Sequence, residues 1–500
     1  MKYGLTEDEI GLIKSVFEKA PEVETVFIYG SRAKNTFKRT SDIDFAVKLI
    51  NGNRFIIASL KDDLDELPII YEIDLTDEKT MDAGDFKEEY ERTKRVFYLK
   101  GWRMVRLGDV AEKITKGTTP KSFSINNNDV NYIKSESLSY DGVIDESKFA
   151  KITNKTNNEL QRSKLKENDI LLSMAGIFLG KTGLVKKSML PANTNQAVAI
   201  LTVNLNVDYK FLWFKLRDNE SVNYFNSTYS QSAQPNINFE EIKSLPILLP
   251  QITEQRSIAA VLSSFDDKIE LLREQNKTLE SIAQAIFKEW FVKFNFPGAS
   301  GWLIDSQLGK IPVGWRVGKL GDEFNVIMGQ SPEGKSYNQQ DDGYIFFQAR
   351  AEYGERFPIV RLYTTEPNRM AEKFDVLVSV RAPVGDINVA FEKCCIGRGL
   401  AAVRSKYKSY MLYKIMSLKE VFDKFESEGT VFGSINKDSF LKIEVVIPEK
   451  KIIEQFEMIA KQIDYKIFNN YSQIQTLTSI RNALLSKLMK GEIRVKMSEP

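Results

Sequence analysis

Apolar residues recur at alternating spacings of four and three along residues 251–296. This heptad period predicts a long helix whose narrow apolar seam packs against another helix. Asn276 is the polar member of the seam, and a polar residue at such a position fixes register at some cost in stability. The seam consists of Ile258, Leu262, Phe265, Ile269, Leu272, Asn276, Leu279, Ala283, Ile286 and Trp290.

A second heptad stripe lies within residues 449–495, and it is less regular because Arg481 interrupts it. We expect the two helices to pair as an antiparallel coiled coil, since both stripes are narrow. About 42 residues at 1.5 Å each would make a rod of roughly 60 Å, with one globule at each end. The alternative is that each helix covers only its own globule. The second stripe consists of Ile463, Ile467, Asn470, Ile474, Leu477, Arg481, Leu484 and Leu488.

Short runs of Val, Ile, Phe and Tyr, broken by Gly, Pro and Asn, precede each helix. They predict two mainly β domains, at residues 102–250 and 297–448. Three motifs occur in the same order in both domains, which predicts an internal duplication. Trp102–Asp109 returns as Trp315–Asp322, Asp169–Ser173 as Asp375–Ser379, and Ile247–Pro250 as Val445–Pro448.

Residues 1–100 are different and predict a small α/β head. An apolar strand at 25–30 ends in Gly30-Ser31, and a second strand at 41–47 carries Asp42 and Asp44. Asp74 lies on a third expected strand, and a charged helix near 86–98 is expected to join the head to the rest. The expected fold class is α+β multidomain, with this head, two mainly β domains and two long helices forming an antiparallel coiled coil.

The amino-acid composition excludes several kinds of catalytic and metal site. The 500 residues contain no histidine, which excludes Ser-His-Asp and Cys-His catalysis and HExxH zinc sites. The two cysteines are adjacent, which is unsuited to a disulfide framework and fits a reducing compartment. No signal peptide is visible, and no apolar run approaches the roughly 20 residues of a membrane span. We therefore expect a soluble, cytoplasmic protein without a membrane partner.

Charge is unevenly distributed along the chain. Residues 1–100 hold 16 Lys+Arg and 21 Asp+Glu, whereas the remaining 400 hold 54 and 47. An acidic head on a mildly basic body is compatible with nucleic-acid binding by the body.

The duplicated body resembles the specificity subunits of type I restriction–modification systems over about residues 102–495. The resemblance rests on a Trp-Arg-x-x-x-Leu-Gly-Asp start, a Gly-Thr-Thr-Pro or Gly-Gln-Ser-Pro loop, an Asp-led apolar strand, a Pro-terminated strand and a Glu-Gln-led helix. It implies a non-catalytic reader of bipartite double-stranded DNA that docks methyltransferase (M) subunits and is joined by a restriction (R) subunit. It implies no cofactor for the body.

The head carries candidate nucleotide chemistry. Asp42 and Asp44 are separated by one residue, so they project from one face of a strand and can hold Mg²⁺ over a triphosphate, with Gly30-Ser31 forming a phosphate turn. The head resembles a minimal nucleotidyltransferase domain. That resemblance implies Asp42 and Asp44 as metal ligands, Asp74 as third ligand or catalytic base, and Arg32 as a phosphate contact.

Candidate DNA contacts follow from residue type and loop position, because Arg and Lys hold phosphate or read guanine and Asn and Gln read adenine. Gly329–Ser336 also matches the letters of a P-loop, but the turn-rich, acidic residues after it do not predict the required helix. We interpret it as a domain loop. The candidate contacts are Lys116, Lys121, Lys181, Asn195 and Gln196, with Lys335, Arg381 and Arg398 as rough counterparts.

Two other functions compete with DNA recognition. The head can be the primary activity, transferring a nucleotide monophosphate to a protein or other acceptor while the body targets it. Alternatively, the chain is a scaffold with no selective DNA binding.

Overall fold

The chain forms two compact units. One comprises Met1–Asp267 with Thr478–Pro500, and the other comprises Lys268–Leu477. The computed structural model describes residues 2–50, 55–81, 84–176, 179–228, 235–427 and 433–495.

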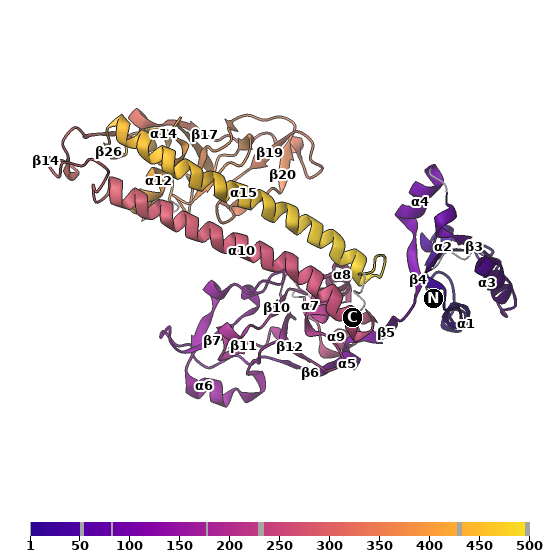
Figure 1. Cartoon of the computed structure of the whole chain (residues 1–500). Helices are drawn as coiled ribbons and strands as arrows, with labels where there is room; N and C mark the ends of the chain where they lie inside the picture. The colour runs from indigo at the N-terminus through magenta and orange to yellow at the C-terminus, as the bar shows by residue number, and fades with distance from the viewer. Residues whose placement is uncertain are drawn as a thin grey trace. The chain divides into compact units, whose positions relative to one another are not determined.

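The head is a four-stranded mixed sheet in the order β3-β2-β1-β4, covered by helices (Figure 1). β2 pairs antiparallel with β1 and parallel with β3. Thr6 begins the first helix through a capping box with Glu9, which satisfies free backbone amides at that end. The elements are α1 (Glu7–Lys19), β1 (Val23–Ile28), α2 (Gly30–Ala33), β2 (Ile43–Leu49), α3 (Phe55–Asp65), β3 (Ile73–Asp77), α4 (Asp85–Thr93) and β4 (Arg95–Leu99).

The three strands expected in the head are present, but the helix expected near 86–98 is wrong in its second half. α4 ends at Thr93, and the backbone of Lys94 is extended. Residues 95–99 form β4, which pairs antiparallel with β1. Phe97 and Leu99 face the core on alternate positions, so sheet pairing overrides the helical pattern there.

The first β domain contains a four-stranded sheet, a three-stranded sheet and a two-stranded pair of β5 with β13. Its strands are β5 (Arg103–Arg106), β6 (Ala111–Lys116), β7 (Val130–Ile133), β8 (Ala150–Ile152), β9 (Ile170–Ser173), β10 (Thr182–Leu184), β11 (Ala192–Thr194), β12 (Val198–Val203) and β13 (Pro246–Leu249). Its helices are α5 (Leu107–Val110), α6 (Asn154–Glu159), α7 (Tyr209–Arg217), α8 (Asn219–Thr228) and α9 (Phe239–Lys243).

The second β domain contains a four-stranded sheet, a five-stranded sheet and a two-stranded pair of β16 with β26, and a hairpin of β14 and β15 precedes them. Its strands are β14 (Leu303–Ser306), β15 (Gly309–Pro312), β16 (Arg316–Lys319), β17 (Asn325–Met328), β18 (Tyr337–Asn338), β19 (Tyr344–Phe347), β20 (Leu362–Thr364), β21 (Met370–Ala371), β22 (Val376–Ser379), β23 (Ile387–Val389), β24 (Cys394–Ile396), β25 (Leu400–Arg404) and β26 (Glu444–Ile447). Its helices are α11 (Leu320–Glu323), α12 (Lys408–Ser417), α13 (Lys419–Ser427) and α14 (Lys437–Leu441).

The sheets show that the duplication is structural. The four-stranded sheet has the order β10-β9-β12-β6 in the first domain and β23-β22-β25-β17 in the second. The motif strands β9 and β22 occupy the same inner place, and all four residues of each are buried. In each domain the strand after the repeated Trp also pairs antiparallel with the last strand, β5 with β13 and β16 with β26. The predicted internal repeat is therefore confirmed.

Two helices of 40 residues each, α10 (Ile252–Phe291) and α15 (Lys450–Met489), follow the two domains (Figure 1). Both contribute residues to both units. In the unit of Lys268–Leu477 they pair through Ile269, Leu272 and Ile474. In the other unit, Ile258 and Leu262 share a core with Leu485 and Leu488. Within the unit of Lys268–Leu477, Ile269 and Leu272 meet Ile474, whereas Phe287 further along α10 meets Phe456, which comes earlier on α15. The pairing is therefore antiparallel, as predicted.

The helices also complete the cores of the β domains. The two arrangements considered from the sequence, pairing of the helices and covering of the domains, therefore occur together. Phe287 of α10 and Phe456 of α15 stack edge-on at 5.6 Å between ring centroids, and both belong to the core of the second β domain. Burying such aromatic side chains stabilises by about 1.5–3 kcal/mol each. In the part of the chain that the structure describes, no helix has the length and apolar character needed to cross a membrane.

Candidate functional site

The head brings its acidic residues together at one end of β2 and β3. Asp44 and Asp74 lie directly opposite each other in the parallel register of these strands. Asp42 precedes β2 by one residue and is exposed, so it and Asp44 lie two positions apart at the same strand end. The three carboxylates that the sequence singled out therefore share one edge of the sheet.

Gly30 allows close approach to this edge. Its φ is +68°, and a Cβ added there would lie 2.3 Å from Oδ2 of Asp44. A side chain at this position is excluded both by the backbone conformation and by the carboxylate. Gly30 and the half-buried Ser31 begin α2 beside Asp44, which is the placement expected for a phosphate turn.

The electrostatics of this edge favour a cation. Burial raises the pKa of Asp44, and the charges of Asp74 and Asp42 raise it further, against a smaller opposing effect of Arg32. Burial also raises the pKa of Tyr29, and the charges of Asp44 and Asp74 act in the same direction. An oxygen-only donor set is the kind that Mg²⁺ prefers. Among the described residues, however, no three metal-ligating side chains are assembled into a ready-made site. Mg²⁺ and nucleotide binding by the head therefore stay predictions.

Arg32 is placed differently from the expected phosphate contact. It is 1% exposed, and its guanidinium donates to the backbone carbonyls of Tyr3, Ser41 and Asp42. It also stacks on Tyr71 at 4.1 Å from the ring centroid. These bonds hold the loop that presents Asp42. These bonds give Arg32 a structural role that its sequence position did not reveal, and its contact with phosphate stays a prediction.

The loops that follow β6 and β17 occupy equivalent places in the two β domains. A Cβ on Gly117 would lie 2.0 Å from the carbonyl oxygen of Asn195, and one on Gly329 would lie 2.2 Å from that of Gly397. Each loop therefore lies against the turn that precedes the next inner strand of its sheet. Gln196 and Arg398 lie on these turns and are exposed.

Four of the candidate DNA contacts lie around the first of these turns. Lys116 ends β6 and Lys121 follows the loop, and both are exposed. Gln196 bonds to the hydroxyl of Thr119. Asn195 is half-buried, and its side-chain Oδ1 is buried without a hydrogen-bond partner. The four residues therefore lie on the same loop and turn, with the amide oxygen of Asn195 buried, and DNA contact by them stays a prediction.

The remaining candidates do not form an equivalent cluster. Lys181 lies over the ring of Tyr140, 5.9 Å from its centroid. Its backbone amide donates to Oγ of Ser173, and that of Asp386 donates to Oγ of Ser379. The counterpart of Lys181 is thus Asp386 and not Arg381, and DNA contact by Lys181 and by Arg381 stays a prediction.

Lys335 lies in a 3-10 turn at Gly334–Ser336, and its ammonium pairs with Glu333 at 2.9 Å. Strand β18 follows, not the helix that a P-loop requires, which agrees with the interpretation of Gly329–Ser336 as a domain loop. Arg381 is exposed beside Ser434, with which it forms a β-bridge.

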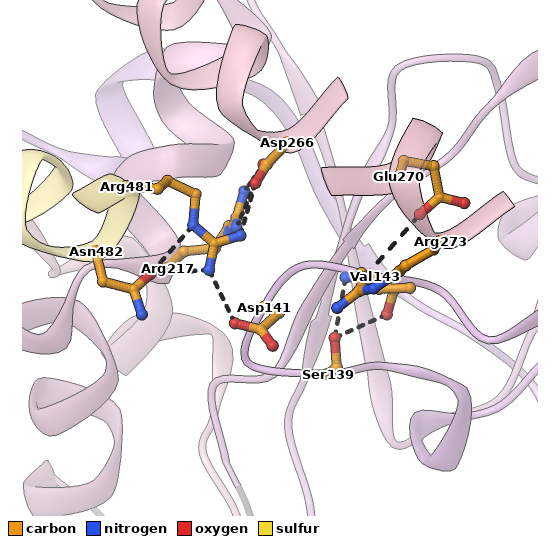
Figure 2. A network of polar contacts seen from close by, with 9 residues as sticks. All are labelled: Ser139, Asp141, Val143, Arg217, Asp266, Glu270, Arg273, Arg481 and Asn482. Carbon is orange, nitrogen blue, oxygen red and sulfur yellow. Dashed lines mark hydrogen bonds and ion pairs between the residues drawn. The ribbon is translucent and has the colours of Figure 1, made fainter. Parts of the chain in front are cut away.

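Sequence reasoning missed a buried ion network around Arg481 (Figure 2). Asp266 of α10 accepts from Arg217 at 2.6 Å and from Arg481 at 2.6 Å, and Arg481 also donates to Asp141 at 3.0 Å. Arg481 is 4% exposed. Its break in the heptad was the only signal, because its carboxylate partners lie more than 200 residues away.

The Glu-Gln start of α10 also has a structural explanation. The buried Glu254 accepts from Nε1 of Trp102 at 3.0 Å and from Arg494 at 2.8 and 2.6 Å. The buried Gln255 accepts from the amide of Asp208 and donates to the carbonyl of Pro250. The motif therefore ties the start of the first β domain, the start of α10 and the segment after α15 together.

Comparisons with known proteins agree with this architecture. Residues 99–281 and 312–486 match the family model of the type I restriction modification DNA specificity domain. Residues 12–101 match the model of polymerase beta, nucleotidyltransferase. The putative type I restriction enzyme MjaX specificity subunit of Methanocaldococcus jannaschii is 32% identical, over 82% of this chain and 98% of the relative.

Two further relatives are more distant. The type I restriction enzyme HindI specificity subunit of Haemophilus influenzae is 24% identical over 79% of this chain and all of the relative. The crystal structure of a type I restriction–modification system S subunit from M. genitalium is 16% identical, with a TM-score of 0.49, and the alignment covers 79% of this chain and 97% of that one.

Fold, repeat and motifs define a duplicated DNA-specificity protein with two spacer helices and an added nucleotidyltransferase-like head. The chain belongs to the specificity subunits of type I restriction–modification systems.

Proposed function

We propose that this chain reads a bipartite DNA sequence, with one half-site for each β domain, within a complex that contains methyltransferase and restriction subunits. The observation that carries the proposal is the repetition of one sheet order and one loop arrangement in two domains of a specificity subunit. Two copies of one reader on stiff helices suit a ligand that repeats along an axis, and duplex DNA is such a ligand. Each helix has 40 residues, which corresponds to about 60 Å.

We further propose that the helices dock the methyltransferase subunits. Both carry exposed apolar side chains outside the seam, including Leu271 and Ile282 on α10 and Met458 and Tyr465 on α15. Apolar side chains of this size contribute most of the stabilisation when a partner surface buries them. The Leu271→Glu and Tyr465→Glu variants should no longer copurify with a methyltransferase subunit. The Lys277→Glu variant, on α10 like Leu271, should still copurify with it.

The test of sequence reading is reconstitution with a partner methyltransferase, S-adenosylmethionine and plasmid, followed by mapping of the methylated adenines. A single gapped motif with two specified halves is the expected result. Methylation that is absent or scattered without a motif would contradict the proposal.

A second candidate function is nucleotidyl transfer by the head, favoured by the opposed Asp44 and Asp74 and by the close approach at Gly30. Mg²⁺ bound there would neutralise charge on a triphosphate. Asp42 and Asp44 would hold it, and Asp74 would be a third ligand or would take the proton of the acceptor hydroxyl as its oxygen attacks the α-phosphorus and pyrophosphate leaves. Labelled ATP with Mg²⁺ should label an acceptor only with the wild-type chain, and the Asp42→Ala/Asp44→Ala double variant should be inactive. No labelling of any candidate acceptor would contradict it.

A further inference from the structure

The two β domains present one residue each at the same place in the same turn. The amide of Gly117 donates to the carbonyl of Val198 at 3.1 Å, and that of Thr118 to the carbonyl of Thr194 at 2.9 Å. In the second domain, Gly329 donates to Leu400 at 2.9 Å and Gln330 to Ile396 at 3.0 Å. These four bonds align the two loops residue by residue.

The facing turns align as well. The amide of Val198 donates to the carbonyl of Asn195 at 3.2 Å, and the amide of Leu400 donates to that of Gly397 at 3.0 Å. Each is a four-residue turn leading into an inner strand. Gln196 is the second residue of the first turn, and Arg398 is the second residue of the other.

The surroundings of these two side chains also correspond. The third loop residue has a hydroxyl side chain in both domains, Thr119 in the first and Ser331 in the second. Thr119 bonds to the side chain of Gln196, and Oγ of Ser331 accepts from the backbone amide of Arg398 at 3.3 Å. Both residues are exposed, and a small residue follows each of them. At this shared, exposed position the two domains carry side chains of different chemistry.

We propose that Gln196 and Arg398 are the paired specificity-determining residues of the two domains, with Gln196 reading an adenine in one half-site and Arg398 reading a guanine in the other. This inference rests on the proposed bipartite DNA recognition. Gln matches the N6 and N7 edge of adenine with two hydrogen bonds, and Arg matches the O6 and N7 edge of guanine. A tight turn held by backbone bonds on both sides fixes the position of the reading side chain, as base discrimination requires.

The neighbouring candidates suit other tasks. Asn195 has its Oδ1 buried, and its counterpart Gly397 has no side chain, so that position is not shared. Lys116 and Lys121 align with Met328 and Glu333, so these charges are not shared either. As exposed lysines beside the first turn they suit phosphate, which positions a protein on DNA without reading sequence.

The experiment uses the full chain in its methyltransferase complex and maps methylated motifs for Gln196→Arg, Gln196→Ala and Arg398→Gln. Gln196→Arg should change the preferred base pair at one position of one half-site, and Arg398→Gln should do so at one position of the other. Gln196→Ala should relax that first position. A bidentate base contact is worth about 1–3 kcal/mol, so relative binding of the two base pairs should shift by roughly 5- to 150-fold.

Asn206→Arg and Lys406→Gln are the matched controls. They make a similar change of charge on exposed residues beyond the far ends of β12 and β25, and should leave the motif unchanged. An unchanged motif in all three turn variants would overturn the inference while leaving bipartite reading intact, and so would uniform weakening of all sites. Failure of the wild-type complex to give any gapped motif would instead overturn the proposed function.

Discussion

Asn470 of α15 donates its side-chain amide to Oδ1 of Asn276 on α10 at 2.9 Å, inside the apolar seam of the two helices. Asn470 is fully buried, and its own Oδ1 has no hydrogen-bond partner. The pair therefore lowers stability in exchange for a fixed register, because only one alignment lets the two amides meet.

Replacing both asparagines by leucine should stabilise the helix pair, whereas replacing one should destabilise the protein. The single Asn276→Leu variant leaves a buried amide without its acceptor, at a cost of about 1–3 kcal/mol. Urea unfolding of both single variants and of the double variant measures this directly. A double variant less stable than either single variant would contradict the assignment.

Asp266 should be the most sensitive member of the buried ion network, since it is the carboxylate shared by Arg217 and Arg481. Asp266→Ala leaves two buried guanidinium groups without that charge and should cost about 3–5 kcal/mol. Arg481→Met removes one of two cations and keeps the apolar stem, so we expect a smaller loss. Denaturant unfolding of both variants, with the exposed Arg256→Ala as control, tests this order.

Glu254 and Glu454 offer a matched pair at the same motif position of the two helices. Glu254 is buried and bonds to Arg494 and Trp102, whereas the side chain of Glu454 is 49% exposed. Glu254→Ala should cost about 2–3 kcal/mol, the range for buried hydrogen bonds to charged groups. Glu454→Ala should cost less than about 1 kcal/mol, as exposed ion pairs do. Equal losses in thermal unfolding would contradict the difference in burial.

Gly329→Ala should disrupt the loop that holds the Arg398 turn. The new Cβ would meet the backbone of Gly397 at 2.2 Å, and overpacking of this kind costs about 1–3 kcal/mol. Gly334→Ala in the same loop is the control, because nothing lies within 4 Å of its Cβ position. Thermal unfolding and the motif of the second half-site should both change for Gly329→Ala alone.

Asp44→Asn should stabilise the head while abolishing any metal binding there. The folded-state pKa of Asp44 is raised, by burial and then by Asp74 and Asp42, so its contribution to stability is fully present at low pH and is lost as pH rises through that pKa. Removing the like charge opposite Asp74 should gain about 0.5 kcal/mol at neutral pH.

The gain from Asp44→Asn should shrink as the pH falls, and Mg²⁺ should raise the unfolding temperature of the wild-type chain but not of the variant. Thermal unfolding from about pH 4, near the usual pKa of a carboxylate, to about pH 8 measures the pH dependence and the response to Mg²⁺. A variant that still responds to Mg²⁺ would show that the ion binds elsewhere.

Local pattern in the sequence determined the repeat, the heptad helices and the strands that carry Asp44 and Asp74, because period and residue type report burial on one face. It also identified Asn276 as the polar seam residue. Tertiary structure alone decided that Asn470 is its partner, that Asp266 holds Arg481, that Arg32 is buried and that Gln196 aligns with Arg398. Those relationships depend on which backbones pack together, and neither spacing nor propensity encodes a contact between residues that lie far apart in the chain. For the same reason, residues 95–99, for which the sequence pattern predicts a helix, form a strand because they pair with β1.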